Sequence, residues 1–131
     1  MISTRGRYAL RVMIDLAEHR DEGYIPMKDV VARQDISKKY MEQIMPSLVK
    51  NGVVEGVHGK GGGYKLTKAP SEYTAGEILR AAEGDLAPVA CLSCNAEECP
   101  RKKDCKTLPL WEKFNDMTND YFDSVTLESL L

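Results

Sequence analysis

The pattern of hydrophobic and polar positions predicts three helices in the first 52 residues. Apolar residues spaced by three or four positions predict a helix over roughly residues 4–20, and a glycine and a proline interrupt the chain after it. A short second helix follows. A connector at residues 35–37 leads to a third helix, for which Ser37 is the expected N-cap and Gly52 the expected left-handed residue after its end. The apolar faces expected for these helices are, in chain order, Ala9, Val12, Met13, Leu16 and Ala17; Met27, Val30 and Val31; and Tyr40, Met41, Ile44, Met45 and Leu48.

After Gly52 the hydrophobic period changes. The stretch VVEGVHGKGGGYKLTK is rich in β-branched residues and glycine, and it predicts a two-stranded hairpin with a flexible tip at residues 59–63. The stretch TAGEILRAAEG predicts a helix that starts with Thr74 and Glu77 at capping-box spacing and ends at Gly84. The cysteine-rich segment that follows has no clear period. The last predicted element is a long helix whose single apolar stripe is formed by Leu110, Phe114, Met117, Tyr121 and Val125.

The order of these elements predicts the fold class. A helix, a short turn, a second helix and a hairpin follow one another in a winged helix-turn-helix. The sequence therefore predicts a mainly α-helical protein with a small β-hairpin. We divide it into a winged helix-turn-helix region at 1–84, a cysteine-rich loop at 85–108, and a long helix with a tail at 109–131.

Charges are unevenly distributed along the 131 residues, although the net charge is only −2. Residues 1–68 carry 12 Lys and Arg against 8 Asp and Glu, a net charge of +4, whereas residues 69–131 carry 6 against 12, a net charge of −6. The basic half suits a polyanion such as DNA. The composition is that of an ordinary soluble protein, and charges interrupt the N-terminal segment every few residues. We therefore expect neither a signal peptide nor a membrane span, and place the protein in the cytoplasm.

The second helix of the helix-turn-helix pair is the expected recognition helix, and its polar face has side chains that can read DNA. The exposed positions are Ser37, Lys38, Lys39, Glu42 and Gln43. Gln43 can make two hydrogen bonds to adenine, Glu42 can accept one from the cytosine amine, and a lysine can bind phosphate or guanine. The alternative is that these residues are only the solvated face of a helix.

The glycine-rich tip HGKGGGY has three interpretations. A nucleotide-binding phosphate loop is disfavoured, because neither a Lys-Ser/Thr pair nor a helix follows it. A plain hairpin turn needs only one or two glycines. A DNA-binding wing explains three consecutive glycines beside a basic residue, with His58 or Lys60 reaching phosphate or the minor groove.

All four cysteines, Cys91, Cys94, Cys99 and Cys105, lie within fifteen residues. A disulfide, a tetrahedral zinc site or an iron–sulfur cluster can each explain such a group. A cytoplasmic chain with its own core has little need of a disulfide, and the spacing alone does not separate the other two. Two histidines and no Ser/His/Asp or Cys/His constellation indicate that the protein is not an enzyme. An electron carrier would not need a recognition helix and a wing.

Four segments together resemble the IscR family of iron–sulfur cluster regulators and its wider transcription-factor family. They are STRGRYALRVMIDLA, ISKKYMEQIMPSLVKNGVVEGVHGKGGGYKL, TAGEILRAAEG and CPRKKDCKTLPLW, which occur in the family's order over essentially the whole chain. The resemblance implies a homodimeric repressor that binds a palindromic operator and controls genes for iron–sulfur cluster assembly. It implies that the helices at 109–131 cross at the dimer interface. It also implies a 2Fe–2S cluster held by three cysteines and one ligand that is not cysteine.

The resemblance assigns roles to individual residues. Cys91, Cys99 and Cys105 fall where the family has its cluster ligands, Glu42 and Gln43 match its base-reading pair, Ser37 and Tyr40 match positions that approach DNA, and His58 stands where an arginine commonly enters the minor groove.

The sequence also departs from the family pattern in and after the cysteine segment, where the gap from Cys91 to Cys99 is longer than usual. Leu108 occupies the position that is often the histidine ligand, and Cys94 is an additional cysteine. The fourth ligand is thus either Cys94 or a residue other than cysteine. The functional alternatives are a regulator of the same fold that binds zinc, or one that senses thiols or redox state without metal.

Overall fold

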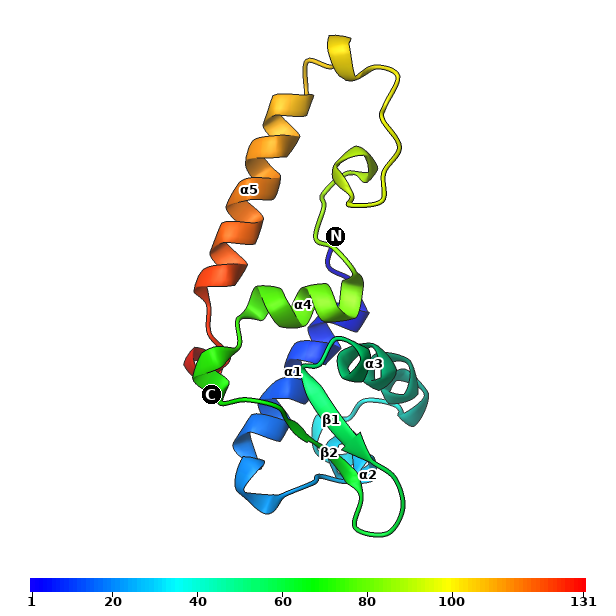
Figure 1. The fold of residues 1–131 in the computed structure, drawn as a ribbon, viewed down its shortest axis with the longest axis vertical. Coiled ribbons are helices and arrows are strands. Elements are labelled where there is room, and N and C mark those ends of the chain that lie inside the picture. The colour runs from blue at the N-terminus through cyan, green and yellow to red at the C-terminus, as the bar shows by residue number, and fades with distance from the viewer.

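The computed structural model describes all 131 residues and contains five α-helices and one antiparallel pair of strands (Figure 1). In chain order the elements are α1 (Thr4–Glu18), α2 (Met27–Gln34), α3 (Lys38–Lys50), β1 (Val54–Val57), β2 (Gly63–Leu66), α4 (Ala75–Glu83) and α5 (Leu108–Ser124). The strand register pairs Val54 with Leu66 and Val57 with Gly63. The predicted fold class, a mainly α-helical winged helix-turn-helix with a small hairpin and a long C-terminal helix, is confirmed.

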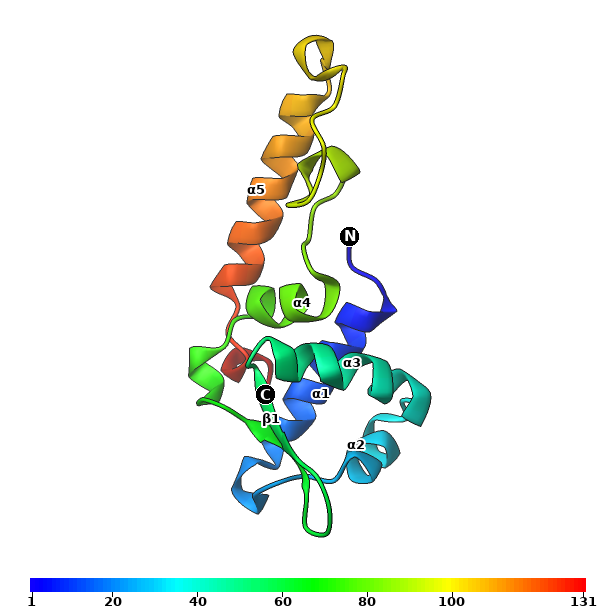
Figure 2. The ribbon, with the colours of Figure 1, turned by 45° about the vertical axis from the view of Figure 1, so that its right-hand side comes forward.

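The molecule has a body and an arm. Figures 1 and 2 show α1 to α4 and the hairpin packed together as the body, while α5 rises from it with residues 85–107 running alongside as the arm. No helix has both the length and the apolar content needed to cross a membrane.

Side-chain caps explain where α3 and α4 begin. Ser37 Oγ accepts a hydrogen bond from the amide of Tyr40 at 3.2 Å, as predicted for the N-cap of α3. Thr74 Oγ1 accepts one from the amide of Glu77 at 3.1 Å and caps α4. The Glu77 carboxylate, however, accepts from Lys68 Nζ at 2.8 and 3.0 Å. The predicted capping box is therefore only half formed, because an ion pair holds its second member.

The core of the body contains most of the predicted apolar positions. It includes Ala9, Val12, Met13, Leu16, Ala17, Val30, Met41, Ile44, Met45 and Leu48. Tyr40 was predicted to share this face, but it is 38 % exposed. Tyr73, which the sequence did not single out, is fully buried, and its hydroxyl donates to the Val53 carbonyl at 2.7 Å. The tyrosine can occupy the core because its polar end has a partner there.

A buried carboxylate fixes the helix-turn-helix. Asp15 on α1 is 1 % exposed, and its oxygens accept hydrogen bonds from Arg33 on α2 at 2.7 and 3.0 Å and from Gln34 Nε2 at 3.0 Å. Burial raises the pKa of Asp15, but the hydrogen bonds from Arg33 and Gln34 and the charges of Arg33 and His19 outweigh it and hold that pKa below its ordinary value. The ionised carboxylate therefore ties α2 to α1 and sets the position from which α3 departs.

The C-terminal end of α5 is attached to α4. Arg80 Nη1 and Nη2 donate to the two Asp123 carboxylate oxygens, each at 2.8 Å, and Nη2 also donates to Asn119 Oδ1 at 2.9 Å. A Cβ at Gly76 would lie 2.2 Å from Asp123 Oδ1, so glycine at this position permits the close approach. Beyond the helix, Leu127 is fully buried. The orientation of the arm is thus set at its base.

Candidate DNA-binding surface and cysteine pocket

The N-terminal half of α3 presents polar side chains to solvent. Ser37, Lys38, Lys39, Glu42 and Gln43 are all exposed. The buried face of α3 holds it against the body through Met41, Ile44, Met45 and Leu48, so the polar face points outward. Lys38 Nζ lies 4.0 Å from Glu42 Oε1, a solvated contact of little strength. The side chains that the sequence predicted to read bases are therefore brought together on one free surface.

Two tyrosines and an arginine border this surface. The rings of Tyr40 and Tyr8 meet edge to face with centroids 5.3 Å apart, and the Arg11 guanidinium lies 5.2 Å from the centroid of the Tyr8 ring. Tyr40 is thus held from α1 while remaining accessible. Tyr8 was not among the predicted site residues. Its place in the first helix carried no signal of the contact with Tyr40, which arises only when α1 and α3 pack together.

Two glycines of the hairpin are required for it to fold, whether or not they also let its backbone approach DNA. A Cβ at Gly62 would lie 2.2 Å from the Val57 carbonyl oxygen, and one at Gly63 would lie 2.3 Å from the Ile25 carbonyl oxygen. These two positions must lack a side chain if the hairpin is to close and pack beside residue 25. His58 and Lys60 are exposed at the tip, as a wing requires.

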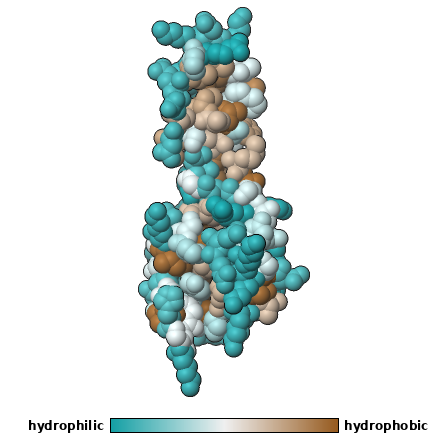
Figure 3. Space-filling view, turned by 90° about the vertical axis from the view of Figure 1, so that its right-hand side faces the viewer, coloured by the Kyte–Doolittle hydropathy of each residue, from teal (hydrophilic) through white to brown (hydrophobic).

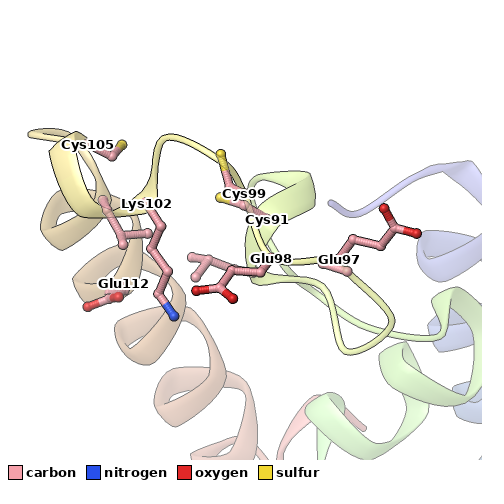
Figure 4. A pocket seen from close by; sticks show the side chains of 10 residues that line it. Cys91, Glu97, Glu98, Cys99, Lys102, Cys105 and Glu112 are labelled. Atoms are coloured by element: carbon pink, nitrogen blue, oxygen red, sulfur yellow. The ribbon is translucent and has the colours of Figure 1, made fainter.

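Three of the four cysteines line one pocket. Cys91, Cys99 and Cys105 surround a cavity of about 410 Å³ between the loop and the first turns of α5, together with Leu108 and Glu112. In Figure 4, Cys91 and Cys99 lie near one another, Cys105 lies across the pocket, and Glu98 and Lys102 extend into the space between the loop and α5. The sequence spacing of these cysteines did not show that α5 would form the opposite wall.

Cys94 belongs to a different cluster. Its thiol donates to Asp85 Oδ2 at 3.5 Å, and the same carboxylate accepts from Ser93 Oγ at 2.5 Å and, through Oδ1, from the Ala87 amide at 3.0 Å. The hydrogen bonds from Ser93, Ala87 and Cys94 lower the pKa of Asp85. Asp85 therefore organises the start of the loop and holds Cys94 outside the pocket. It was missed in the sequence, where its only signal was its place directly after Gly84.

Cys105 has an environment that favours the thiolate. Its sulfur lies 3.5 Å from Thr107 Oγ1. Hydrogen bonds from the Thr107 side chain and amide, another from the Leu108 amide, and the charge of Arg101 lower the pKa of the Cys105 thiol. Thiolate is the form that binds metal and the form that reacts with oxidants.

The cysteine thiols of the pocket are suitable ligands for a metal group, but they lie too far apart to bind one in this conformation. No three Cys, His, Asp or Glu side chains are close enough to hold one metal ion in this conformation. Three thiols on one pocket are the ligand type that iron–sulfur clusters use, whereas Leu108, which lines the same pocket, offers no donor atom. Binding would require the loop to contract around the cavity.

The α5 helix presents its apolar stripe away from the body. Leu110, Phe114, Met117 and Tyr121, here called the α5 stripe, are 60, 51, 58 and 65 % exposed. Val125, predicted as the last member, ends the helix and is half-buried. Figure 3 views the arm from the side of residues 85–107 and shows hydrophobic residues on that side too, whereas the lowest part of the molecule, where Figure 1 places the hairpin tip, is hydrophilic. An exposed apolar row of this kind is typical of a subunit interface.

Comparison with known proteins identifies the family. Residues 2–131 match the Rrf2 family, described as "Iron-dependent Transcriptional regulator". The chain is 36 % identical over 130 residues to the transcriptional regulator IscR of Pectobacterium carotovorum subsp. carotovorum (strain PC1), an alignment that covers 99 % of this chain and 78 % of the relative.

Solved structures give the same result. The structure of CymR, the global cysteine regulator of B. subtilis, superposes with a TM-score of 0.79 at 36 % identity and covers 99 % of this chain and 95 % of that one. The structure of T. potens IscR superposes with a TM-score of 0.74 at 33 % identity and covers 99 % and 85 %. Transcriptional regulators are not enzymes, which agrees with the sequence prediction. This chain belongs to the Rrf2 family of DNA-binding transcriptional regulators.

Proposed function

We propose that the protein is a cytoplasmic, homodimeric regulator that binds a palindromic operator and senses iron–sulfur cluster supply through Cys91, Cys99 and Cys105, with a 2Fe–2S cluster as the ligand. One observation carries this proposal. The three thiols line a single pocket against α5, although up to thirteen residues separate them, while Asp85 holds the fourth cysteine outside. A pocket of thiols is the chemistry that a cluster requires.

The position of the pocket links it to DNA binding. Residues 85–107 connect the end of α4 to the start of α5, and α5 is fixed to α4 at its other end through Arg80 and Asp123. Contraction of the loop around a bound cluster would move the first two turns of α5, which bear Leu108 and Glu112. If the α5 stripe forms the dimer interface, the two recognition helices then change their relative positions. The coupling needs only that the ligand bind one dimer arrangement better than the other.

A second candidate is a regulator of the same fold that senses thiols without metal. Its support is the similarity to CymR, the global cysteine regulator of B. subtilis, together with the free state of all four cysteines and the lowered pKa of the Cys105 thiol. Such a thiol would be oxidised readily.

Purification without oxygen, with iron and sulfide supplied, distinguishes the cluster-binding regulator from the metal-free one. We expect a coloured protein with charge-transfer absorption that bleaches in air, and two iron and two sulfide per chain by chemical analysis. Cys99→Ala and Cys105→Ala should each lose the colour, because each removes a thiol from the pocket. Cys94→Ala is the matched control and should keep it.

Other outcomes separate the alternatives. A colourless protein with one zinc per chain contradicts the cluster. A colourless, metal-free protein whose DNA affinity changes reversibly on thiol oxidation supports the second candidate. Loss of colour in Cys94→Ala but not in Cys91→Ala would mean that the roles of these two cysteines are reversed.

Base selectivity should depend on Glu42 and Gln43. Gln43→Ala is expected to lose about 1–3 kcal/mol of discrimination at one base pair, because a bidentate contact disappears. Glu42→Ala should broaden the set of bound sequences with little loss at the best site, because an anion near phosphates is tolerated only where a cytosine amine offsets the repulsion.

The measurement is selection from random duplexes, with all proteins compared at the same salt concentration and the same cluster occupancy. Glu128→Ala, which removes an exposed carboxylate near the C-terminus, is the control and should change nothing. An unchanged site preference in both α3 variants would show that this helix does not read bases.

A further inference from the structure

We propose that the groove between the helix-turn-helix and the hairpin is a binding site for the DNA backbone, with Lys28 and Lys50 as its phosphate ligands. The groove has a volume of about 630 Å³ and is lined by residues of three elements: the start of α2, the last turns of α3 and the hairpin from Gly56 to Tyr64. The proposal rests on the proposed function, in which α3 reads bases, as the recognition helix of a helix-turn-helix does from the major groove.

The charges of this groove have one sign. Lys28 and Lys50 are the charged side chains that line it, and no aspartate or glutamate does; His58 lines it as well. Neither lysine has a carboxylate within 4.0 Å, whereas three other lysines, Lys38, Lys65 and Lys68, each have one. Unpaired lysines around a concave surface concentrate positive potential, which favours a polyanion.

The lining of the groove suits a phosphate backbone better than base edges. Four glycines and two prolines are among its thirteen lining residues, and the lining residues with polar side chains are Lys28, Lys50, His58 and Tyr64. A strand of backbone, which presents the same phosphates in every sequence, can lie there. Lysine binds phosphate as a point charge and needs no fixed geometry.

The location agrees with this assignment. Lys50 lies at the opposite end of α3 from Glu42 and Gln43, on the side that faces the hairpin. When α3 occupies the major groove and the hairpin tip the adjacent minor groove, the strand between the two grooves passes over this surface. Lys28, Lys50 and His58 all line the groove in which that strand would lie. Of these three residues only His58 was predicted, because the sequence does not show that the hairpin folds beside Lys28 and Lys50.

The test is the salt dependence of DNA binding by Lys28→Gln, Lys50→Gln and the double variant. The probes are a duplex selected by the wild-type protein and a random-sequence duplex. Each phosphate contact contributes about 0.9 to the slope of log K against log salt, so each substitution, present in both subunits of a dimer, should lower that slope by about 2. Affinity for both duplexes should fall by at least about tenfold at 0.1 M salt.

Lys103→Gln removes the same charge from the far end of the arm and is the matched control. Its slope should equal that of the wild type, and thermal unfolding of all variants should be unchanged because the side chains are exposed. An unchanged slope in either groove variant, or a changed sequence preference in either, would overturn the proposal. Failure of the wild-type protein to bind any duplex would instead contradict the proposed function.

Discussion

Met117→Asp is expected to convert the protein to a monomer and to weaken operator binding by at least about 100-fold. Met117 lies in the middle of the α5 stripe and is 58 % exposed in the single chain. In the proposed dimer it meets the partner's stripe, where a new carboxylate would be buried without a partner at a cost of several kcal/mol. The operator affinity falls because a monomer binds one half-site and loses the gain of a linked second one.

Light scattering measures the result as a fall from twice the chain mass of 14.6 kDa to that mass. Met117→Leu retains an apolar side chain of similar volume and should remain dimeric. The helix itself should survive in both variants, since Met117 contacts solvent in the isolated chain, and circular dichroism checks this. A Met117→Asp protein that keeps its dimer mass would place the interface elsewhere.

Gly63→Ala is expected to destabilise the body by at least about 3 kcal/mol. The residue has φ 153°, and a Cβ there would lie 2.3 Å from the Ile25 carbonyl oxygen and 2.8 Å from the Pro26 nitrogen. Both neighbours are backbone, so neither can move aside alone. The Ile25 and Tyr64 amides donate to each other's carbonyls at 2.8 and 2.9 Å, and the displacement would break this bridge.

Gly61→Ala is the matched comparison. Gly61 has φ 78°, but nothing lies within 4 Å of the added Cβ. Its cost should be only the backbone strain of about 1 kcal/mol. Denaturant unfolding of the two variants measures the difference. Equal stabilities would mean that the hairpin does not pack on residue 25 as described.

The sequence predicted the elements of the body well because each one is encoded locally. Ser37 and Thr74 cap helices where their side chains and positions indicated, and the periodic residues of α1 and α3 are buried. Tyr40 is the instructive exception. Its position in the period of α3 placed it inside, but Tyr8 supports its ring from outside the core. The hydrophobic periodicity of one helix does not show which side chains a neighbouring helix places against it.

The candidate site was less predictable, because its geometry arises between distant segments. The sequence grouped four cysteines, yet only the fold separates Cys94 from the pocket, by means of the Asp85 carboxylate nine residues earlier. Similarly, Lys28 and Lys50 look like ordinary solvated lysines until the hairpin folds beside them. The family resemblance predicted which cysteines are ligands, but only the structure shows that α5 forms one wall of their pocket.

The ion pair between Arg80 and Asp123 has a consequence for the operator. The 17 residues of α5 make a lever about 25 Å long, and this pair, together with the buried Leu127, sets the angle at which the lever leaves the body. A tilt of about 8° would displace the far end by about 3.4 Å, which is the rise of one base pair. In the proposed dimer, the spacing between half-sites would therefore be set where α5 joins α4, away from the residues proposed to contact bases. A regulator with a longer or shorter operator can arise by resetting this angle while its recognition helix stays the same.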